Sequence, residues 1–200
     1  MARESVVSEM SQIDFSGPYG ICNQHPRLLF EEPISKTAGV YLWTARTPDG
    51  FIVEYVGQTG ESFAKRTKDH AIQTFGGNYR ICDARLMREG KLKVVWPGLW
   101  RKGTRDKMAE FAQRYLDLAP FIVDYLRTIE VFLAPVNGNR RFRERIEGAL
   151  ARHIWDQPPP ASNLLPTDVR YRQRREDEVP VSVGLRCGEK IVGVPNSLWI

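Results

Sequence analysis

The sequence has few cysteines, and they are widely spaced. Cys22, Cys82 and Cys187 lie far apart in 200 residues and form no CxxC pair. An odd number of scattered cysteines argues against a disulfide framework and against structural zinc, and it is typical of a reducing compartment. A chain of this length can also bury enough apolar surface to fold as one domain without such staples.

Long apolar runs are absent as well. No stretch of about 18 apolar residues occurs, as a membrane-spanning helix would need. The first fifteen residues, MARESVVSEMSQIDF, lack the apolar core of a signal peptide. We therefore expect a cytoplasmic protein with no membrane partner.

Positive charge is in moderate excess. The chain has 29 Lys and Arg against 24 Asp and Glu, a formal net charge of +5. This excess favours an anionic partner, but it fits equally well a basic protein that has no such partner.

Two segments predict a β-hairpin. Val40–Ala45 and Phe51–Gly57 are rich in β-branched and aromatic residues, and Thr47–Gly50 supplies a Pro-Asp-Gly turn between them. Whether Tyr41 and Tyr55 face one site cannot be decided from their spacing, because the turn breaks the alternation of faces along the chain.

Helices and a third strand are expected further along. Ser62 is a candidate N-cap for the helical stretch FAKRTKDHAIQTF, on which Arg66 and His70 are four apart and share a face. Thr128–Val136 has the composition of a strand, and Arg140–Trp155 has apolar residues at helical spacing after an Asn-Gly-Asn turn. Another helix is expected from about residue 104 to 118, and one or two short strands near the C-terminus.

Six polar positions in this order form a recognisable set. Gly39-Val40-Tyr41 and Tyr55-Val56-Gly57 come first, and the other members are Arg66, His70, Glu147 and Asn163. The arrangement resembles the GIY-YIG nucleases, with valine in place of isoleucine in both tripeptides.

The resemblance implies an α+β fold, in which a small antiparallel sheet with a three-stranded core is flanked by helices. It implies a single GIY-YIG endonuclease domain over residues 1–200. The expected parts are an N-terminal arm (1–37), a catalytic core (38–75 and 128–164), a DNA-recognition insertion (76–127) and a C-terminal extension (165–200).

Glu147 is the metal ligand that the resemblance implies. A lone carboxylate can hold Mg²⁺ or Mn²⁺, because such an ion takes oxygen ligands and fills its other positions with water and phosphate oxygens. From spacing alone Glu144 is the alternative, although it lies nearer the arginines of the first helical turn and suits a solvated partner for them. No small-molecule cofactor is expected.

Arg66 suits phosphate binding, because its planar guanidinium stays charged and can engage two oxygens. By resemblance Tyr41 is the favoured general base, and Tyr55 orients the water or the phosphate. A phenol with a pKa near 10 costs on the order of 4 kcal/mol to ionise at pH 7 unless its surroundings lower that pKa. Arg66, a bound cation and a hydrogen bond from His70 would all lower it.

Three residues have supporting roles. His70 could hydrogen-bond a tyrosine or the attacking water. Lys68 is a further possible base or phosphate contact, although a lysine on an exposed helix face is usually only solvated. Asn163 is expected to tie the glutamate helix to the sheet through hydrogen bonds to backbone.

Basic residues elsewhere are candidates for DNA contacts. The stretch 80–107 is basic and contains two tryptophans, and arginines crowd the start of the helix at Arg140, where positive charge opposes the helix dipole. The alternative is a solvated basic helix end balanced by Glu144 and Glu147. The DNA-binding candidates are Lys68, Arg80, Arg85, Arg88, Lys91, Lys93, Arg101, Lys102, Arg105, Arg140, Arg141 and Arg143.

The compact size and the Arg66–His70 pair are similar to the type II restriction endonucleases of this superfamily, some of which cut CCGCGG. The expected function is Mg²⁺-dependent hydrolysis of double-stranded DNA at a short GC-rich palindrome, with tyrosine-assisted water activation. Cutting a palindrome implies a homodimer. The alternatives are a structure-directed GIY-YIG nuclease of repair or mobile elements, and a non-catalytic nucleic-acid-binding protein.

Overall fold

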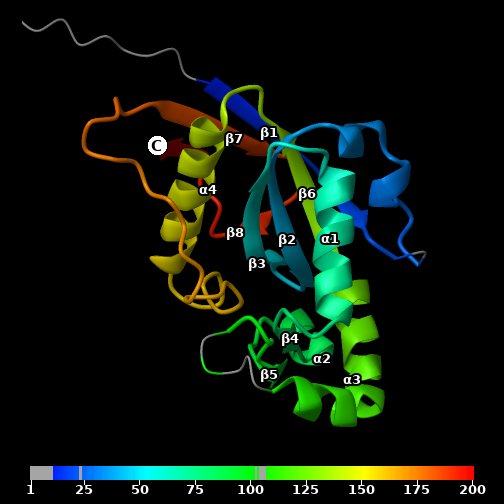
Figure 1. The fold of residues 1–200 in the computed structure, drawn as a ribbon. Helices are drawn as coiled ribbons and strands as arrows, with labels where there is room; N and C mark the ends of the chain where they lie inside the picture. Colours follow the sequence, from blue (N-terminus) through cyan, green and yellow to red (C-terminus); the bar gives the residue numbers. More distant parts are fainter. Residues whose placement is uncertain (1–10, 23, 102, 104–106) are drawn as a thin grey trace, which may run out of the picture.

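A computed structural model describes residues 11–22, 24–101, 103 and 107–200 (Figure 1). The expected hairpin is confirmed: β2 (Gly39–Thr47) pairs antiparallel with β3 (Gly50–Thr59). The helix that follows, α1 (Phe63–Phe75), is also confirmed. Ser62 is its N-cap as expected, because the Ser62 side chain accepts a hydrogen bond from the Lys65 N–H at 3.2 Å.

The expected strand and helix of the second half are confirmed too. β6 (Ile129–Pro135) pairs antiparallel with β2, and α4 (Arg140–Trp155) begins where Asn139 accepts a hydrogen bond from the Phe142 N–H at 2.8 Å. The helix before β6 is longer than expected, because α3 runs from Met108 to Thr128.

The prediction of a small three-stranded antiparallel sheet is wrong. The sheet has seven strands in the order β8-β3-β2-β6-β1-β7-β9, and it is mixed, because β1 pairs parallel with β7 and β3 with β8. The four added strands come from the two ends of the chain. They are β1 (Ser11–Gly20), β7 (Ser182–Cys187), β8 (Ile191–Val192) and β9 (Ser197–Trp199).

A short link forces the sheet to curl. β8 and β7 stand five strand spacings apart in the sheet order, which is about 24 Å in a flat sheet. The chain passes from Cys187 to Ile191 in four steps, which can span only about 14 Å. The two edges therefore bend toward each other, and the sheet becomes a half-barrel.

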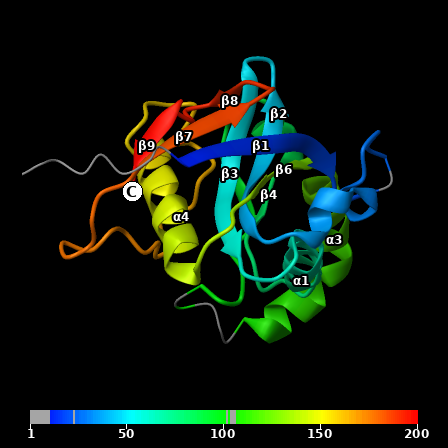
Figure 2. The same ribbon diagram turned by 90° about the horizontal axis from the view of Figure 1, so that it is seen from above.

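Both faces of the sheet are covered, which explains why β2 is buried along most of its length. Tyr41 and Trp43 belong to the core on the side of α1 and α3, whereas Val40 and Leu42 belong to the core on the side of α4. Figure 2 shows α4 near β3 and β9, with α1 and α3 on the other side.

The first part of the insertion, before α3, folds beside α1 and α3. Its elements are β4 (Ile81–Cys82), α2 (Ala84–Arg88) and β5 (Val94–Trp96), and the two strands form a small separate sheet. Two 3-10 helices, η1 (Leu29–Glu31) and η2 (Pro33–Lys36), connect β1 to β2. None of the helices in the described part of the chain is long and apolar enough to cross a membrane.

We expect Leu150→Ala in α4 to lower the free energy of unfolding by about 2–5 kcal/mol, because Leu150 is fully buried and a cavity would remain. The matched control is Leu116→Ala in α3, where the side chain is 85% exposed and the change should stay within about 0.5 kcal/mol. Urea denaturation of both variants measures the difference, and equal losses would contradict the described burial of α4.

Candidate active site

The hairpin brings Tyr41 and Tyr55 to the same face of the sheet. Tyr41 lies opposite Gly57, and Trp43 lies opposite Tyr55. Because residues two apart on a strand share a face, both tyrosine rings point to the side on which α1 packs. Their ring centroids are 6.2 Å apart. The two tyrosines therefore line one site.

A glycine is required between the two rings. A Cβ atom at Gly57 would overlap the Tyr41 ring and hydroxyl and would lie 2.7 Å from a carbon of the Tyr55 ring. Real Cβ atoms essentially never come that close to another atom. The glycine of the Tyr55-Val56-Gly57 stretch thus has a steric reason.

Arg66 connects α1 to the tyrosines. Its Nε donates a hydrogen bond to the Tyr41 hydroxyl at 3.2 Å, and the guanidinium also hydrogen-bonds the Tyr55 and Tyr79 hydroxyls. The side chain is half-buried, and none of the ion pairs among the described residues includes it. A guanidinium that is surrounded by neutral phenols keeps its charge for an anionic ligand.

Burial opposes the ionisation of both tyrosines. It raises the pKa of Tyr41 well above its usual value, although the Arg66 guanidinium acts in the opposite direction. Burial and the nearby Glu147 carboxylate raise the pKa of Tyr55 to about 12, again against Arg66. Arg66 thus acts in the direction that the sequence predicts, but burial outweighs it, and both phenols are neutral at pH 7.

His70 is enclosed by aromatic rings. Its ring centroid lies 5.1 Å from those of Trp43 and Tyr55 and 4.9 Å from that of Tyr79. Burial and the Arg66 charge lower its pKa to about 3, so that the imidazole is neutral. Nε2 is buried and has no hydrogen-bond partner among the described residues, so it does not make the expected hydrogen bond to a tyrosine.

Glu147 faces the same site from α4. It is half-buried and interacts electrostatically with Tyr41, Tyr55 and Arg66. Burial raises its pKa to about 7, although a hydrogen bond from the Gln58 backbone acts against this rise. A nearby cation would stabilise the ionised form of this carboxylate.

Glu144 forms ion pairs with arginines inside the protein. It is 4% exposed and forms ion pairs with Arg140 at 2.9 Å, Arg172 at 3.0 Å and Arg141 at 3.6 Å. Burial would favour the neutral acid, but the hydrogen bonds from Arg140 and Arg172 lower its pKa. It is a partner for the arginines as expected, but a buried one and not a solvated one.

Asn163 makes a backbone hydrogen bond, but not to the sheet. Its side chain donates to the Gly90 carbonyl at 2.8 Å, which ties the segment after α4 to the loop that follows α2. The expected link from the glutamate helix to the sheet is therefore not what this side chain makes. Lys68 lies on the exposed face of α1, away from the buried face that carries His70.

Two of the basic candidates, Arg80 and Arg143, are largely enclosed, whereas Arg88 is exposed but also has a partner inside the protein. Arg80 pairs with the buried Glu54 at 2.9 Å and also donates to the Leu164 carbonyl. Arg88 donates to the Thr128 hydroxyl at 2.6 Å. Arg143 is 8% exposed, its Nη1 donates to the Gly138 carbonyl at 2.6 Å, and its Nε has no hydrogen-bond partner among the described residues.

Six of the other basic candidates form ion pairs. Where both partners are exposed, such a pair is worth about 0–1 kcal/mol, so a phosphate group can replace the acid at little cost. The pair of Arg140 with the buried Glu144 is the exception, because losing it would leave a buried charge unpaired. Lys102 and Arg105 lie outside the described residues. The pairs are Arg85 and Lys91 with Glu89, Lys93 with Asp83, Arg101 with Asp168, Arg140 with Glu144, and Arg141 with Glu178.

Two further tyrosines reach the site and were not predicted from the sequence. Tyr79, from the start of the insertion, hydrogen-bonds Arg66 and packs on His70. Tyr171, from the C-terminal extension, interacts electrostatically with Tyr55 and Glu147. Neither has a local motif that could have marked it, because only the folded chain brings these distant segments together.

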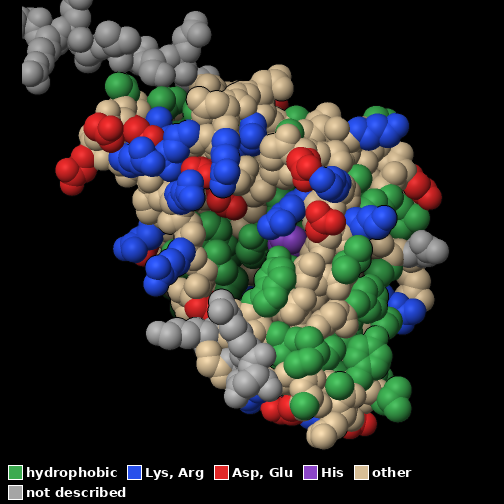
Figure 3. All heavy atoms as spheres, viewed as in Figure 1, with side chains coloured by type: hydrophobic (Ala, Val, Ile, Leu, Met, Phe, Trp, Pro, Cys, Tyr) green, Lys and Arg blue, Asp and Glu red, His purple; other side chains and the backbone are tan. Residues whose placement is uncertain are grey.

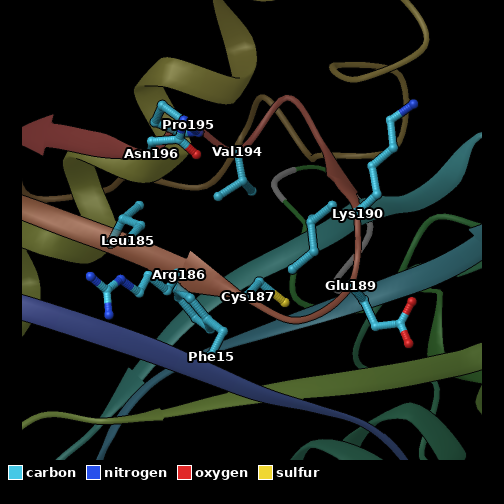
Figure 4. Close-up of a pocket in the computed structure, with 10 residues that line it drawn as sticks. Phe15, Leu185, Arg186, Cys187, Glu189, Lys190, Val194, Pro195 and Asn196 are labelled. Carbon is cyan, nitrogen blue, oxygen red and sulfur yellow. The ribbon is translucent and has the colours of Figure 1, made fainter.

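Most side chains of the site are buried: Tyr41 is 1% and His70 5% exposed, whereas Arg66 and Glu147 are half-buried. Figure 3 shows this face hollowed between α4 and α1, with a histidine beside the hollow and basic side chains above it. Two cavities of the described chain lie elsewhere. The cavity in Figure 4 has about 200 Å³ and is lined by Phe15, Cys187 and Val194 among others, and one of about 290 Å³ is lined by Ile52 and Pro160 among others.

No family model matches the sequence, and neither a curated protein nor a solved structure is significantly similar to it. Within the described residues, no group of three or more His, Cys, Asp or Glu side chains could hold a metal ion. A site with one carboxylate suits Mg²⁺, which usually keeps several waters and takes one or two carboxylates together with phosphate oxygens. The Gln58 backbone hydrogen-bonds Glu147, and the Gln58 side-chain Oε1 is buried without a partner among the described residues.

We expect the raised pKa of Glu147 to make stability fall as pH rises. Between pH 4.5 and about 7 the unfolded chain has lost this proton while the folded chain keeps it, so unfolding becomes easier over that window. Glu147→Gln should remove part of the fall in the urea midpoint between pH 5 and pH 7.5.

Mg²⁺ binding provides a second test of the role of Glu147. At pH 7.5 the ion should raise the urea midpoint of the natural protein, because it binds the folded state, and it should leave the Glu147→Gln variant unchanged. Glu176→Gln, at an exposed acid, is the matched control and should behave like the natural protein. An equal response of all three proteins to Mg²⁺ would remove Glu147 as the ligand.

Proposed function

We propose that this protein is a Mg²⁺-dependent endonuclease that hydrolyses phosphodiester bonds in double-stranded DNA. The observation that carries the proposal is the convergence of Tyr41, Tyr55, Arg66 and His70 on one site beside Glu147. These are five of the six positions by which the sequence resembles the GIY-YIG nucleases, and the sixth, Asn163, hydrogen-bonds the Gly90 carbonyl instead. The five residues come from β2, β3, α1 and α4, so their meeting is not a result of sequence proximity.

Arg66 binds the scissile phosphate in this proposal. Its guanidinium is held by phenol oxygens and by no carboxylate among the described ion pairs, so binding a phosphate breaks no ion pair. The neutral Nε2 of His70 supplies a further hydrogen bond, to a phosphate oxygen or to the attacking water. Both groups are pre-positioned, and pre-positioned charges and donors are the main source of catalysis in phosphodiester hydrolysis.

Glu147 would hold the divalent ion, with Gln58 Oε1 as a neighbouring oxygen. When bound, Mg²⁺ supplies positive charge that favours hydroxide over water and neutralises the phosphate oxygens. Tyr41 holds its proton at rest and orients the water through its hydroxyl, and the small ionised fraction of Tyr41 accepts a proton from that water. Tyr55 packs beside Tyr41, interacts electrostatically with Glu147 and would orient the water or the phosphate.

We further propose that the enzyme is of restriction type and acts as a homodimer on a short GC-rich palindrome such as CCGCGG. The resemblance to compact GIY-YIG restriction endonucleases supports this, as do the basic side chains around the site, which suit the phosphates of a duplex. Lys102 and Arg105 stay candidate contacts on the sequence alone.

Incubation of the protein with plasmid DNA and Mg²⁺ tests the function. We expect discrete fragments from the natural protein and from Glu176→Gln, and at least a 100-fold slower reaction for Glu147→Ala with DNA binding retained, since metal-assisted water activation is lost. Cutting only at junctions or branches would favour a structure-directed nuclease. Binding without any cutting would favour a non-catalytic nucleic-acid-binding protein, and full activity of Glu147→Ala would exclude its metal role.

The pH profile of the cleavage rate tests Tyr41. Its raised pKa means that the ionised fraction grows with pH throughout the neutral and alkaline range, so the rate should rise from pH 7.5 to pH 9.5. Tyr41→Phe should flatten this rise and slow cleavage by about 10² to 10⁴ at pH 9.

Tyr19→Phe is the matched control for that variant, because Tyr19 is also buried and its hydroxyl accepts a hydrogen bond from Arg27 at 3.1 Å, away from the site. It should keep the rate and its pH dependence. If Tyr41→Phe kept both as well, the Tyr41 phenol would be structural.

A further inference from the structure

Trp100 is an exposed aromatic side chain at the end of a row of packed rings. His70 packs on Tyr79 with ring centroids 4.9 Å apart, and Tyr79 packs edge-to-face on Trp100 at 5.2 Å. His70 is buried, whereas Trp100 is 54% exposed. The row therefore leads from the buried tyrosines of the candidate active site to the surface.

The backbone around Trp100 is held in place. The Trp100 N–H donates to the Asn78 carbonyl at 3.2 Å, and the buried indole of Trp96 donates to the Gly77 carbonyl at 2.8 Å. Between them Gly98 has a φ of +90°, and a Cβ there would lie 2.8 Å from the Asn78 carbonyl oxygen, so a glycine permits this contact. An exposed indole on a fixed backbone is already ordered before it meets a ligand.

We propose that Trp100 stacks on a nucleobase next to the scissile phosphodiester, and that Tyr79 is the positioning residue between this indole and Arg66. The inference rests on the proposed function, because it takes Arg66 as the phosphate-binding group. Tyr79 hydrogen-bonds Arg66 and contacts Trp100, so one aromatic ring separates the guanidinium from the indole.

The geometry suits a nucleic-acid strand. Successive bases are about 3.4 Å apart along each strand, so a strand with its phosphate at Arg66 has a base within reach of a side chain one ring away. Aromatic side chains stack on bases of any sequence, and wedges of this kind enter duplexes at base steps that open. The two tryptophans of the insertion thus differ in role: Trp96 is a core residue, and Trp100 meets the ligand.

Tryptophan fluorescence with matched variants tests the proposal. The probe is a linear plasmid fragment, with Ca²⁺ in place of Mg²⁺ to keep it uncut. We expect DNA to quench the fluorescence of the natural protein and of Trp199→Phe, which removes another exposed indole, and to quench that of Trp100→Phe much less. Trp100→Ala should bind the fragment about 10-fold more weakly, and Trp100→Phe should keep most of the affinity because phenylalanine still stacks.

The outcomes separate this inference from the proposed function. If Trp100→Phe is quenched as strongly as the natural protein while plasmid is still cut, the stacking role is wrong and the nuclease proposal stands. Quenching that depends on Trp100 without any cutting keeps the stacking role and removes the nuclease. If the natural protein binds no DNA, both the stacking role and the nuclease proposal are wrong.

The alternative to DNA as the partner of the Trp100 indole is a second copy of the chain. In that case the Trp100 fluorescence would change with protein concentration in the absence of DNA, and Trp100→Ala would alter sedimentation; this result would overturn the proposal. Because Trp100 is exposed, both variants should unfold at the temperature of the natural protein, which a thermal melt checks.

Discussion

The missing side chain at Gly57 is the constraint on which the candidate site depends. The hairpin register sets Gly57 directly opposite Tyr41, and any Cβ there would push the Tyr41 ring away from Arg66. Because Gly57 has no side chain, the Tyr41 ring lies against it, and one guanidinium reaches Tyr41, Tyr55 and Tyr79. The arrangement of the site thus follows from a steric property of the sheet before any charge is considered.

The position of Glu147 depends on a second constraint, the burial of α4 on both sides. One side packs on β3, and the C-terminal extension crosses the other, where Gln173 donates to the Gly148 carbonyl at 2.9 Å and Arg172 pairs with Glu144. A Cβ at Gly148 would lie 2.6 Å from the Arg172 carbonyl oxygen, so the segment touches the helix backbone. The helix cannot slide along β3, and the carboxylate stays beside the tyrosines.

Local patterns could be predicted from the sequence, and long-range pairing could not. The hairpin, α1 and α4 were predictable because alternation, N-caps and helical spacing are local signals. β7 and β8 match the one or two short strands expected near the C-terminus, but their place in the main sheet was not predicted. β1 was missed because it contains Gly and Pro, so that its strand character comes from its partners. The burial of Arg80 was missed for the same reason, since its acid, Glu54, is 26 residues away.

The link between β7 and β8 has a consequence for how the chain is made. The strand β3 lacks its parallel neighbour, and β1 lacks one side, until residues 182–199 have left the ribosome. Unpaired strand edges are templates for pairing with other chains, so a nascent chain carries two such edges until these residues have been made. The same residues that close the sheet therefore also set the moment at which the chain stops being prone to associate with its neighbours on a polysome.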